Sequence, residues 1–310
     1  MRVGGSSFRS SFLVPQLVSF SRLDLLLLLM VMIWGTNFSA IKYALRDFPE
    51  ITFNALRLLL AAVVFLIAMA WQARRVRPTN LPRRDWYVVF TLAVVGTVLY
   101  QLFFLAGVAR TSVANSALIF GCTPVAVAIM AAIAGHERLT QERWLGAVLS
   151  LGGIYALVGH GATLTTTTLV GDALVFAGML CWSLYSVLAQ PLLKRHSPLI
   201  ITGWSMTIGA LLYLVVAARP MVATDWGAIS ATSWILMSAS SLLALAFSYM
   251  VWYTAVQKIG SSRTAVYSNL TPIVAMVVAA VWLGERIGVS QLFGAALILS
   301  GIAVSRHTGS

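Results

Sequence analysis

Long apolar runs separated by short polar joints recur along the whole chain. Each run approaches the roughly 20 apolar residues that a helix needs to cross the hydrocarbon core of a bilayer. The pattern therefore predicts an all-α polytopic membrane protein with ten transmembrane helices. The predicted spans are residues 25–45, 53–71, 86–106, 114–133, 142–158, 171–190, 198–217, 233–253, 264–283 and 289–305.

The positive charges in the joints predict the orientation of the chain. Of the 21 Lys and Arg residues, fifteen fall on the side of the N-terminus and four on the other side, and Lys42 and Arg57 fall inside spans. Because Lys and Arg are enriched in cytoplasmic loops, we expect both termini in the cytoplasm and an even number of spans. Residues 1–22, rich in Ser and Arg, are interpreted as a cytoplasmic leader, with an amphipathic transit peptide as the alternative.

Composition narrows the class of protein further. Hydrophobic residues make up 59% of the chain and charged residues only 10%, against about 25% charged in soluble domains. These values exclude a soluble enzyme, a disordered protein and a secreted disulfide scaffold. The net charge of +12 lies in clusters between spans, so we expect no nucleic-acid partner. Cys122 and Cys181 lie inside apolar runs without metal-ligand spacing, and we expect no metal and no cofactor.

The chain resembles itself at an offset of 148 residues. The matched pairs are Trp34 with Trp182, Thr123-Pro124 with Thr271-Pro272, Glu137-Arg138 with Glu285-Arg286, and Gly153-Ile154 with Gly301-Ile302. The comparison divides the chain into repeats at 23–158 and 169–306, joined by a linker at 159–168. Each repeat has five predicted spans, an odd number, so the second enters the membrane from the opposite side. Inverted-topology repeats of this kind are typical of transporters.

Several motifs resemble those of a known family. They are Trp34-Gly35-Thr36-Asn37-Phe38 with Lys42, then Pro49 and Arg57, Asn115-Ser116-Ala117, Thr123-Pro124 and Gly135-His136-Glu137-Arg138. Over residues 23–306 the chain resembles EamA-type members of the drug/metabolite transporter superfamily. The resemblance implies a ten-helix, exporter-like carrier of amino acids or other small metabolites in the inner membrane. The second repeat departs from the pattern at Cys181-Trp182-Ser183-Leu184-Tyr185.

Polar and aromatic side chains inside the spans are the candidates for a substrate site, because polar groups at membrane depth need a partner or a function. The candidates are Trp34, Asn37, Phe38, Lys42, Tyr100, Asn115, Trp182, Tyr185, Ser186, Tyr249 and Tyr267. In the first span of each repeat they share one helical face. For Asn37 and Ser186 the alternative is a hydrogen bond across a helix–helix contact. Trp252 and Tyr253 fall near a predicted cytoplasmic end, where interfacial aromatics are common.

Two cations and two prolines are candidates for gating. Lys42 lies near the predicted outer face, where it either snorkels to the interface, forms an ion-paired gate or binds a substrate carboxylate. Arg57 is predicted at the outer gate and aligns with the uncharged Met206 of the other repeat. Pro124 and Pro272 each free a carbonyl four residues earlier, which makes them either paired hinges or static kinks.

The predicted function is export of amino acids, with aromatic or bulky ones favoured, because aromatic walls suit planar substrates. No Asp or Glu falls deep within a predicted span and no phosphate loop is present. These features favour gradient-driven efflux, facilitated diffusion or exchange by a non-enzymatic, monomeric protein. A nucleotide-sugar carrier, in which Lys42 and Arg57 would bind phosphates, is the alternative within the superfamily. A sensory receptor and a membrane enzyme are more distant alternatives.

Overall fold

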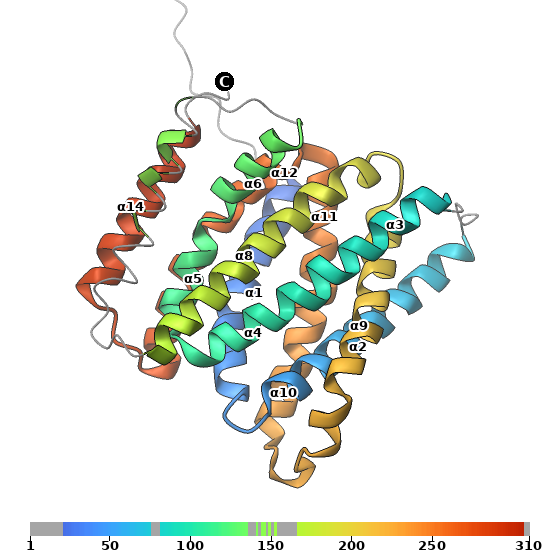
Figure 1. Cartoon of the computed structure of the whole chain (residues 1–310), viewed down its shortest axis with the longest axis horizontal. Coiled ribbons are helices and arrows are strands. Elements are labelled where there is room, and N and C mark those ends of the chain that lie inside the picture. The colour runs from blue at the N-terminus through green and yellow to red at the C-terminus, as the bar shows by residue number, and fades with distance from the viewer. Residues whose placement is uncertain are drawn as a thin grey trace, which may run out of the picture.

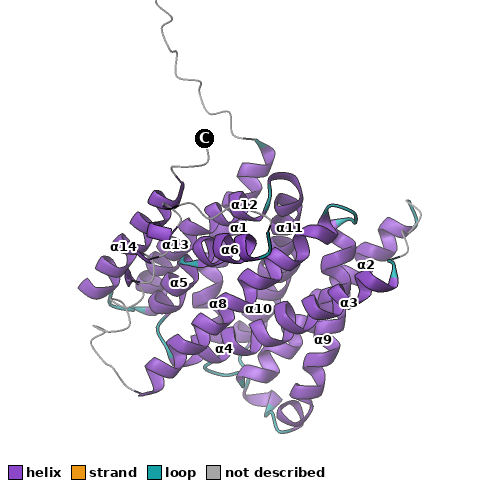
Figure 2. Cartoon of the chain, turned by 45° about the horizontal axis from the view of Figure 1, so that its top comes forward, coloured by secondary structure: helices purple, strands orange, loops and turns teal. Residues whose placement is uncertain are grey.

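The computed structural model of the chain describes residues 21–75, 81–135 and 166–306, and residues 141, 144–146, 148, 149, 152 and 153 between them. Within these residues every element is a helix (Figures 1 and 2). The elements of the first half are α1 (Arg22–Ala44), α2 (Glu50–Ala73), α3 (Arg83–Leu92), η1 (Ala93–Leu99), α4 (Tyr100–Arg110), α5 (Val113–Gly121) and α6 (Thr123–Ile133). The elements of the second half are α8 (Thr166–Leu193), α9 (Pro198–Val222), η2 (Trp226–Ala228), α10 (Ala231–Ala239), η3 (Ser240–Phe247), α11 (Ser248–Ile259), α12 (Ser261–Tyr267), η4 (Ser268–Leu270), α13 (Thr271–Val278), η5 (Ala279–Leu283) and α14 (Val289–Arg306).

In the described residues, eight helical segments are long and apolar enough to cross a membrane. They are Arg22–Ala44, Glu50–Ala73, Arg83–Arg110, Val113–Ile133, Thr166–Leu193, Pro198–Val222, Ala231–Ile259 and Ser261–Leu283. These segments coincide with eight of the ten predicted spans and make the chain a multi-pass membrane protein. The span predicted at 142–158 lies largely outside the described residues. The last predicted span falls on α14, whose apolar stretch, Val289–Gly301, is shorter than the other eight. The count of ten therefore stays a prediction.

Helix boundaries follow local sequence signals. Ser21 and Asp24 form a capping box at the start of α1, in which each side chain accepts a hydrogen bond from the other residue's backbone N–H. Ser112 caps α5 in the same way as Ser21, by accepting from a backbone N–H. Gly260 follows α11 with φ +86°, a conformation that glycine adopts at little cost. These signals keep the joints short and the spans adjacent.

Four of the spans are interrupted, in two matching pairs. The π-helix η1 lies in the third span, and the π-helix η3 lies at the corresponding positions of the second half, 148 residues later. Both Thr-Pro sequences begin a new helical segment, Pro124 at the start of α6 and Pro272 at the start of α13. The helices of the two halves are thus interrupted at matching positions, as expected if the halves are structural repeats.

Helices of the two halves pack against one another across the middle of the bundle. In Figure 1, α4 and α8 run side by side, and α2 lies beside α9, in agreement with their contacts. The twin first helices, α1 and α8, run in opposite directions. α1 ends near Thr111, where Lys42 donates to its carbonyl, whereas α8 begins there, with Asp172 bound to the Thr111 hydroxyl. The interface between the halves thus forms the buried centre of the molecule.

Candidate functional site: an aromatic cavity between the two halves

A small cavity of about 50 Å³ lies at the junction of the two halves. It is lined by Trp34, Asn37, Phe38, Arg57, Tyr100, Phe104, Phe120, Thr123, Trp182, Ala244, Leu245, Tyr249, Ser268 and Thr271. Pockets that hold small organic ligands usually measure about 300–1,000 Å³. The cavity is therefore closed down in this conformation and has to widen before it can hold an amino-acid-sized molecule.

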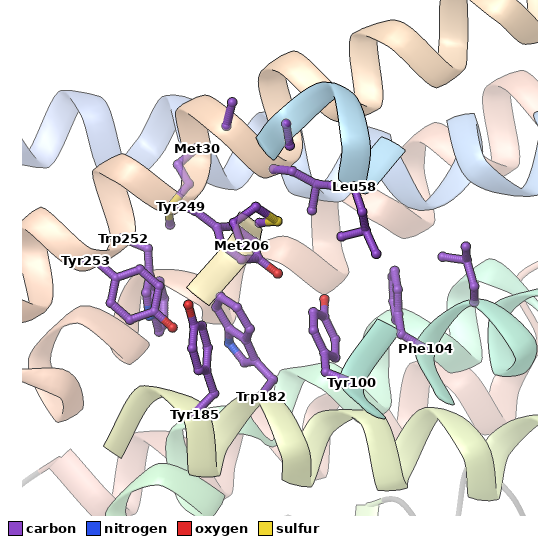
Figure 3. Packing of buried hydrophobic residues seen from close by; sticks show 14 of the residues in the cluster. Met30, Leu58, Tyr100, Phe104, Trp182, Tyr185, Met206, Tyr249, Trp252 and Tyr253 are labelled. Atoms are coloured by element: carbon purple, nitrogen blue, oxygen red, sulfur yellow. The ribbon is translucent and has the colours of Figure 1, made fainter. Parts of the chain in front are cut away.

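Trp182 is the centre of an aromatic cluster around this cavity (Figure 3). Its ring centroid lies 5.5 Å from that of Trp34, 5.3 Å from that of Tyr100 and 5.1 Å from that of Tyr249. Trp34 is further fixed by its indole N–H, which donates to the backbone carbonyl of Ala244 at 3.0 Å. Edge-to-face and tilted pairs at these separations are favourable beyond their apolar burial. The cluster is therefore an ordered wall.

Two pairs of residues contact each other in or beside this wall although they are 148 residues apart in the sequence. We call positions with this offset twin positions. Trp34 packs on Trp182 with an interplanar angle of 88°. The Gln101 side-chain amide donates to the Tyr249 hydroxyl at 3.4 Å. In a molecule built of two related halves, only positions near the axis that relates them can meet their own twins. The cavity therefore lies where the two halves correspond to each other.

Arg57 lies in the cavity wall, on α2, and not at the outer end where the sequence placed it. Its side chain is 1% exposed. The guanidinium lies 5.5 Å from the Phe53 ring centroid and donates to the Asn54 side-chain carbonyl at 3.4 Å. The Ser241 hydroxyl donates to the Arg57 backbone carbonyl at 2.6 Å, which ties α2 to η3. A buried cation thus faces the aromatic wall.

Among the other predicted residues, Asn37 lies in the wall and accepts a hydrogen bond from the Ser240 hydroxyl at 2.5 Å. Tyr185 packs beside Trp182, with ring centroids 5.9 Å apart, and Ser186 lies one turn after Trp182 on α8. The Tyr185 hydroxyl pairs with Ser205 at 2.9 Å, and the Ser186 hydroxyl donates to the Trp182 carbonyl at 3.0 Å. These two side chains support the wall and do not line the cavity.

Three predicted binding residues lie away from the cavity. The Lys42 ammonium donates to the backbone carbonyls of Val108, Ala109 and Thr111, at 2.7 to 3.1 Å. The Asn115 amide donates to the Asp172 carboxylate at 3.3 Å. The Tyr267 hydroxyl donates to the Asp24 carboxylate at 2.5 Å, near the start of α1. In this conformation these residues join helices at the two ends of the bundle.

Polar contacts join helices at both ends of the bundle. At the end that holds Lys42, Arg110 forms an ion pair with Glu50 at 2.9 Å, beside an open pocket of about 430 Å³. At the opposite end, the Asp85 carboxylate binds Arg195 at 3.0 Å and His196 at 2.7 Å. The Arg110–Glu50 pair joins α4 to α2 within the first half, whereas the Asp85 contacts join α3 to the segment that follows α8 in the second half. Water can replace the groups in both sets, so they are suitable contacts to break when one end opens.

The sequence missed part of the wall and misplaced another part. Wall residues Phe104, Phe120 and Thr271 carry no signal that distinguishes them from residues packed in a core or a helix kink. Trp252 and Tyr253, interpreted as interfacial aromatics, are 0% and 1% exposed and belong to the cluster, so that interpretation is wrong. The reason is their position along the helix, because α11 continues to Ile259, beyond the predicted end of the span at residue 253, and both rings lie inside the bundle.

The comparisons with known proteins agree with a transport fold. The model of the EamA-like transporter family matches residues 21–159 and again 169–306. The chain belongs to the EamA-like transporter family. The resemblance found in the sequence motifs is thereby confirmed. Membership of this family makes the protein a transporter of the cell membrane.

Individual relatives of this EamA-like transporter cover nearly its whole length. It is 30% identical over 271 residues to the uncharacterized transporter YyaM of Bacillus subtilis, covering 86% of this chain and 88% of that protein. It is 27% identical to a probable terminal-alkyne amino-acid exporter of Streptantibioticus cattleyicolor, covering 91% and 93%. A solved crystal structure superposes with a TM-score of 0.69 at 18% identity, over 92% of this chain and 96% of that one. That likeness shows a shared fold.

Proposed function

We propose that this EamA-like transporter exports small metabolites, with aromatic or bulky amino acids favoured, by alternating access between two inverted five-helix repeats. The observation that carries the proposal is the aromatic cavity at the junction of the halves, where Trp34 meets its twin Trp182. A substrate at such a junction is reached from one side or the other when the halves rock against each other.

The directions of the twin helices support the inverted arrangement. α1 and α8 run in opposite directions, and their neighbours correspond as well. α1 packs against α11 and α13, while α8 packs against the twins of those helices, α4 and α6. Exchanging the two halves therefore reproduces the same set of neighbours with opposite orientation. With both termini in the cytoplasm, the end that holds Lys42 faces outward.

The state of the cavity supports a transport cycle with closed intermediates. Both ends of the bundle are held by polar contacts, Arg110 with Glu50 at one end and Asp85 with Arg195 at the other. A cavity of about 50 Å³ has room for a water molecule but is too small for an amino acid. Substrate entry therefore requires that one set of contacts break and the aromatic wall move apart.

The preference for amino acids rests on the wall and on one relative. Aromatic side chains offer large, rigid surfaces on which an aromatic or bulky side chain packs. One relative, 27% identical over nearly the full length, is named as a probable amino-acid exporter. A nucleotide-sugar substrate fits less well, because Arg57 is the one cation among the described residues of the wall and Lys42 lies outside it.

The test is uptake of a panel of amino acids and other metabolites into proteoliposomes that hold the purified protein. We expect transport of aromatic or bulky amino acids, and a loss of about tenfold or more in kcat/KM for Trp34→Ala and Tyr249→Ala. Trp71→Ala is the matched control, because Trp71 is 58% exposed and does not line the cavity. Unchanged kinetics in both cavity variants would show that the substrate binds elsewhere.

A further inference from the structure

The buried position of Arg57 is the feature that the proposed function leaves unexplained. Moving a guanidinium out of water costs several kcal/mol, and proteins normally offset this cost with an acidic partner. Arg57 is 1% exposed, and no Asp or Glu forms an ion pair with it among the described residues. Glu50, on the same helix, is bound to Arg110. The charge of Arg57 is therefore left uncompensated.

The hydrogen-bonding capacity of Arg57 is also largely unused. A guanidinium has five N–H donors in a planar fork. The Nε donor is buried and has no partner, and the bond to Asn54 is long at 3.4 Å. The donor belongs to a residue of the cavity wall, so a ligand in the widened cavity is within its reach.

The surroundings of Arg57 contain both hydrogen-bond donors and apolar aromatic rings. The phenol groups of Tyr100 and Tyr249 line the same cavity as Arg57. In Figure 3 their hydroxyls point toward one another, on the side of the cluster that faces Leu58 of α2. Phenol O–H groups donate hydrogen bonds to anions, and the rings beside them form the aromatic wall.

We propose that Arg57 binds the carboxylate of the transported substrate, and that the substrate carries a single carboxylate on an aromatic or bulky apolar body. This inference rests on the proposed function and names the substrate class of the same cavity. The carboxylate accepts from the Arg57 fork in the two-bond geometry that arginine favours. The apolar body then packs against Trp34 and Trp182.

The described wall residues offer no partner for a positively charged group on the substrate, such as an ammonium group. None of the described wall residues is acidic, so an ammonium group finds only π faces and neutral oxygens there. A carboxylate without an amino group therefore binds at least as tightly as the matching amino acid. A phosphate ester carries nearly two negative charges at neutral pH and would need more than one cation. The cavity thus favours carboxylates over phosphate esters and over amines.

The test measures equilibrium binding to the purified protein in detergent, with four ligands that share a phenyl group. They are 3-phenylpropionate, L-phenylalanine, 2-phenylethylamine and phenyl phosphate. We expect 3-phenylpropionate to bind at least as tightly as L-phenylalanine, and both to bind at least tenfold more tightly than the other two. Equal or tighter binding of the amine, or no binding of either carboxylate, would overturn the inference.

Variants of Arg57 supply the second arm. We expect Arg57→Gln to weaken carboxylate binding roughly ten- to a hundredfold, since a charge-assisted hydrogen bond is lost, and Arg57→Lys to weaken it less. The matched control is Arg219→Gln, which removes an exposed arginine and leaves affinity unchanged. The melting temperature of ligand-free Arg57→Gln should equal or exceed that of the wild type, because an uncompensated buried charge is removed.

The two arms separate this inference from the proposed function. If Arg57→Gln keeps wild-type affinity for 3-phenylpropionate, the role of Arg57 is refuted, while transport of amino acids through the cavity stands. If Arg57→Gln does not fold, the ligand preferences of the wild type still decide, because an amine bound as tightly as a carboxylate refutes an anion site. If wild-type proteoliposomes transport none of these compounds or amino acids, the proposed function fails as well.

Discussion

Three backbone carbonyl oxygens hold the ammonium group of Lys42 where α4 ends and the chain turns toward α5. The last carbonyls of a helix have no partner within it, and a cation placed there also interacts favourably with the helix dipole. Lys42 therefore joins α1 to α4 and leaves no donor directed at the central cavity. This explains why a charged residue is tolerated near the end of a membrane span.

Replacing Lys42 with Gln should lower stability and transport together. Bonds from a charged donor contribute about 1.5–3 kcal/mol, so the loss should lower the melting temperature measurably. The rate of transport should fall by a similar factor for every substrate, because the substrate does not touch the residue. Lys42→Arg should restore the protein only in part, since the larger fork fits three converging carbonyls less well. A loss confined to carboxylate substrates, with unchanged stability, would instead make Lys42 a substrate partner.

Asp47, in the joint between α1 and α2, gives a pH-dependent contact outside the membrane spans. Hydrogen bonds from the Ser230 hydroxyl, the Ser233 hydroxyl and the Ser230 backbone N–H lower the pKa of Asp47 below its ordinary value. A carboxylate whose pKa is lower in the folded state stabilises that state above its unfolded pKa. This contribution is lost as the pH falls through the folded pKa.

We therefore expect Asp47→Asn to lower the melting temperature at neutral pH by a small amount. The difference from the wild type should begin to shrink near pH 4, the ordinary pKa of an aspartate in the unfolded chain, and should vanish as the pH falls through the lower pKa of the folded carboxylate. Melting curves of both proteins between pH 3 and pH 7 measure it. A difference that is the same at every pH would show that the carboxylate charge makes no contribution.

At the scale of elements, the two Thr-Pro breaks determine how α5 and α6, and α12 and α13, can move. The carbonyls that the prolines leave without their usual partners are satisfied locally. The Thr123 hydroxyl donates to the Phe120 carbonyl at 2.6 Å, and the Thr271 backbone N–H donates to the Ser268 carbonyl. The breaks therefore cost little in a closed state. Phe120, Thr123, Ser268 and Thr271 also line the cavity, so bending at either break reshapes it.

Pro272→Ala should restore a more continuous helix and slow the opening of the cavity. We expect turnover to fall on the order of tenfold with substrate affinity nearly unchanged, because hinge residues limit conformational steps. Pro198→Ala is the matched control, since Pro198 begins α9, where proline interrupts no hydrogen bond. Transport rates and binding constants of the two variants measure the effect. Wild-type turnover in Pro272→Ala would identify a static kink.

Sequence reasoning predicted the elements well and their contacts less well. Apolar run length found the eight long spans, because membrane thickness sets that length directly. The repeat offset put Trp34 and Trp182 on corresponding faces, and they meet in the wall. Arg57 was placed too near the outer end, because its depth depends on the packing of α2 against α9 and η3. The partners of Lys42 are backbone carbonyls, which leave no trace in a sequence pattern.

At the scale of the whole molecule, the proposed transport cycle depends on the cavity at the junction of the two halves. The Arg110–Glu50 pair lies at one end of the bundle, and the Asp85 contacts with Arg195 and His196 lie at the other. The proposed alternating access requires that the contacts at the two ends break in turn, while the aromatic wall stays available to the substrate. The central claim is therefore that one cavity is reached from both sides of the membrane.

Labelling of a single cysteine in the cavity tests this claim most directly. Ala244→Cys, made with Cys122→Ala and Cys181→Ala, places one thiol in the wall beside Trp34. A membrane-impermeant maleimide is added to one side or the other of oriented proteoliposomes. The account predicts labelling from both sides and protection by a transported substrate on each. Labelling from one side only, or labelling that a transported substrate does not reduce, would contradict it.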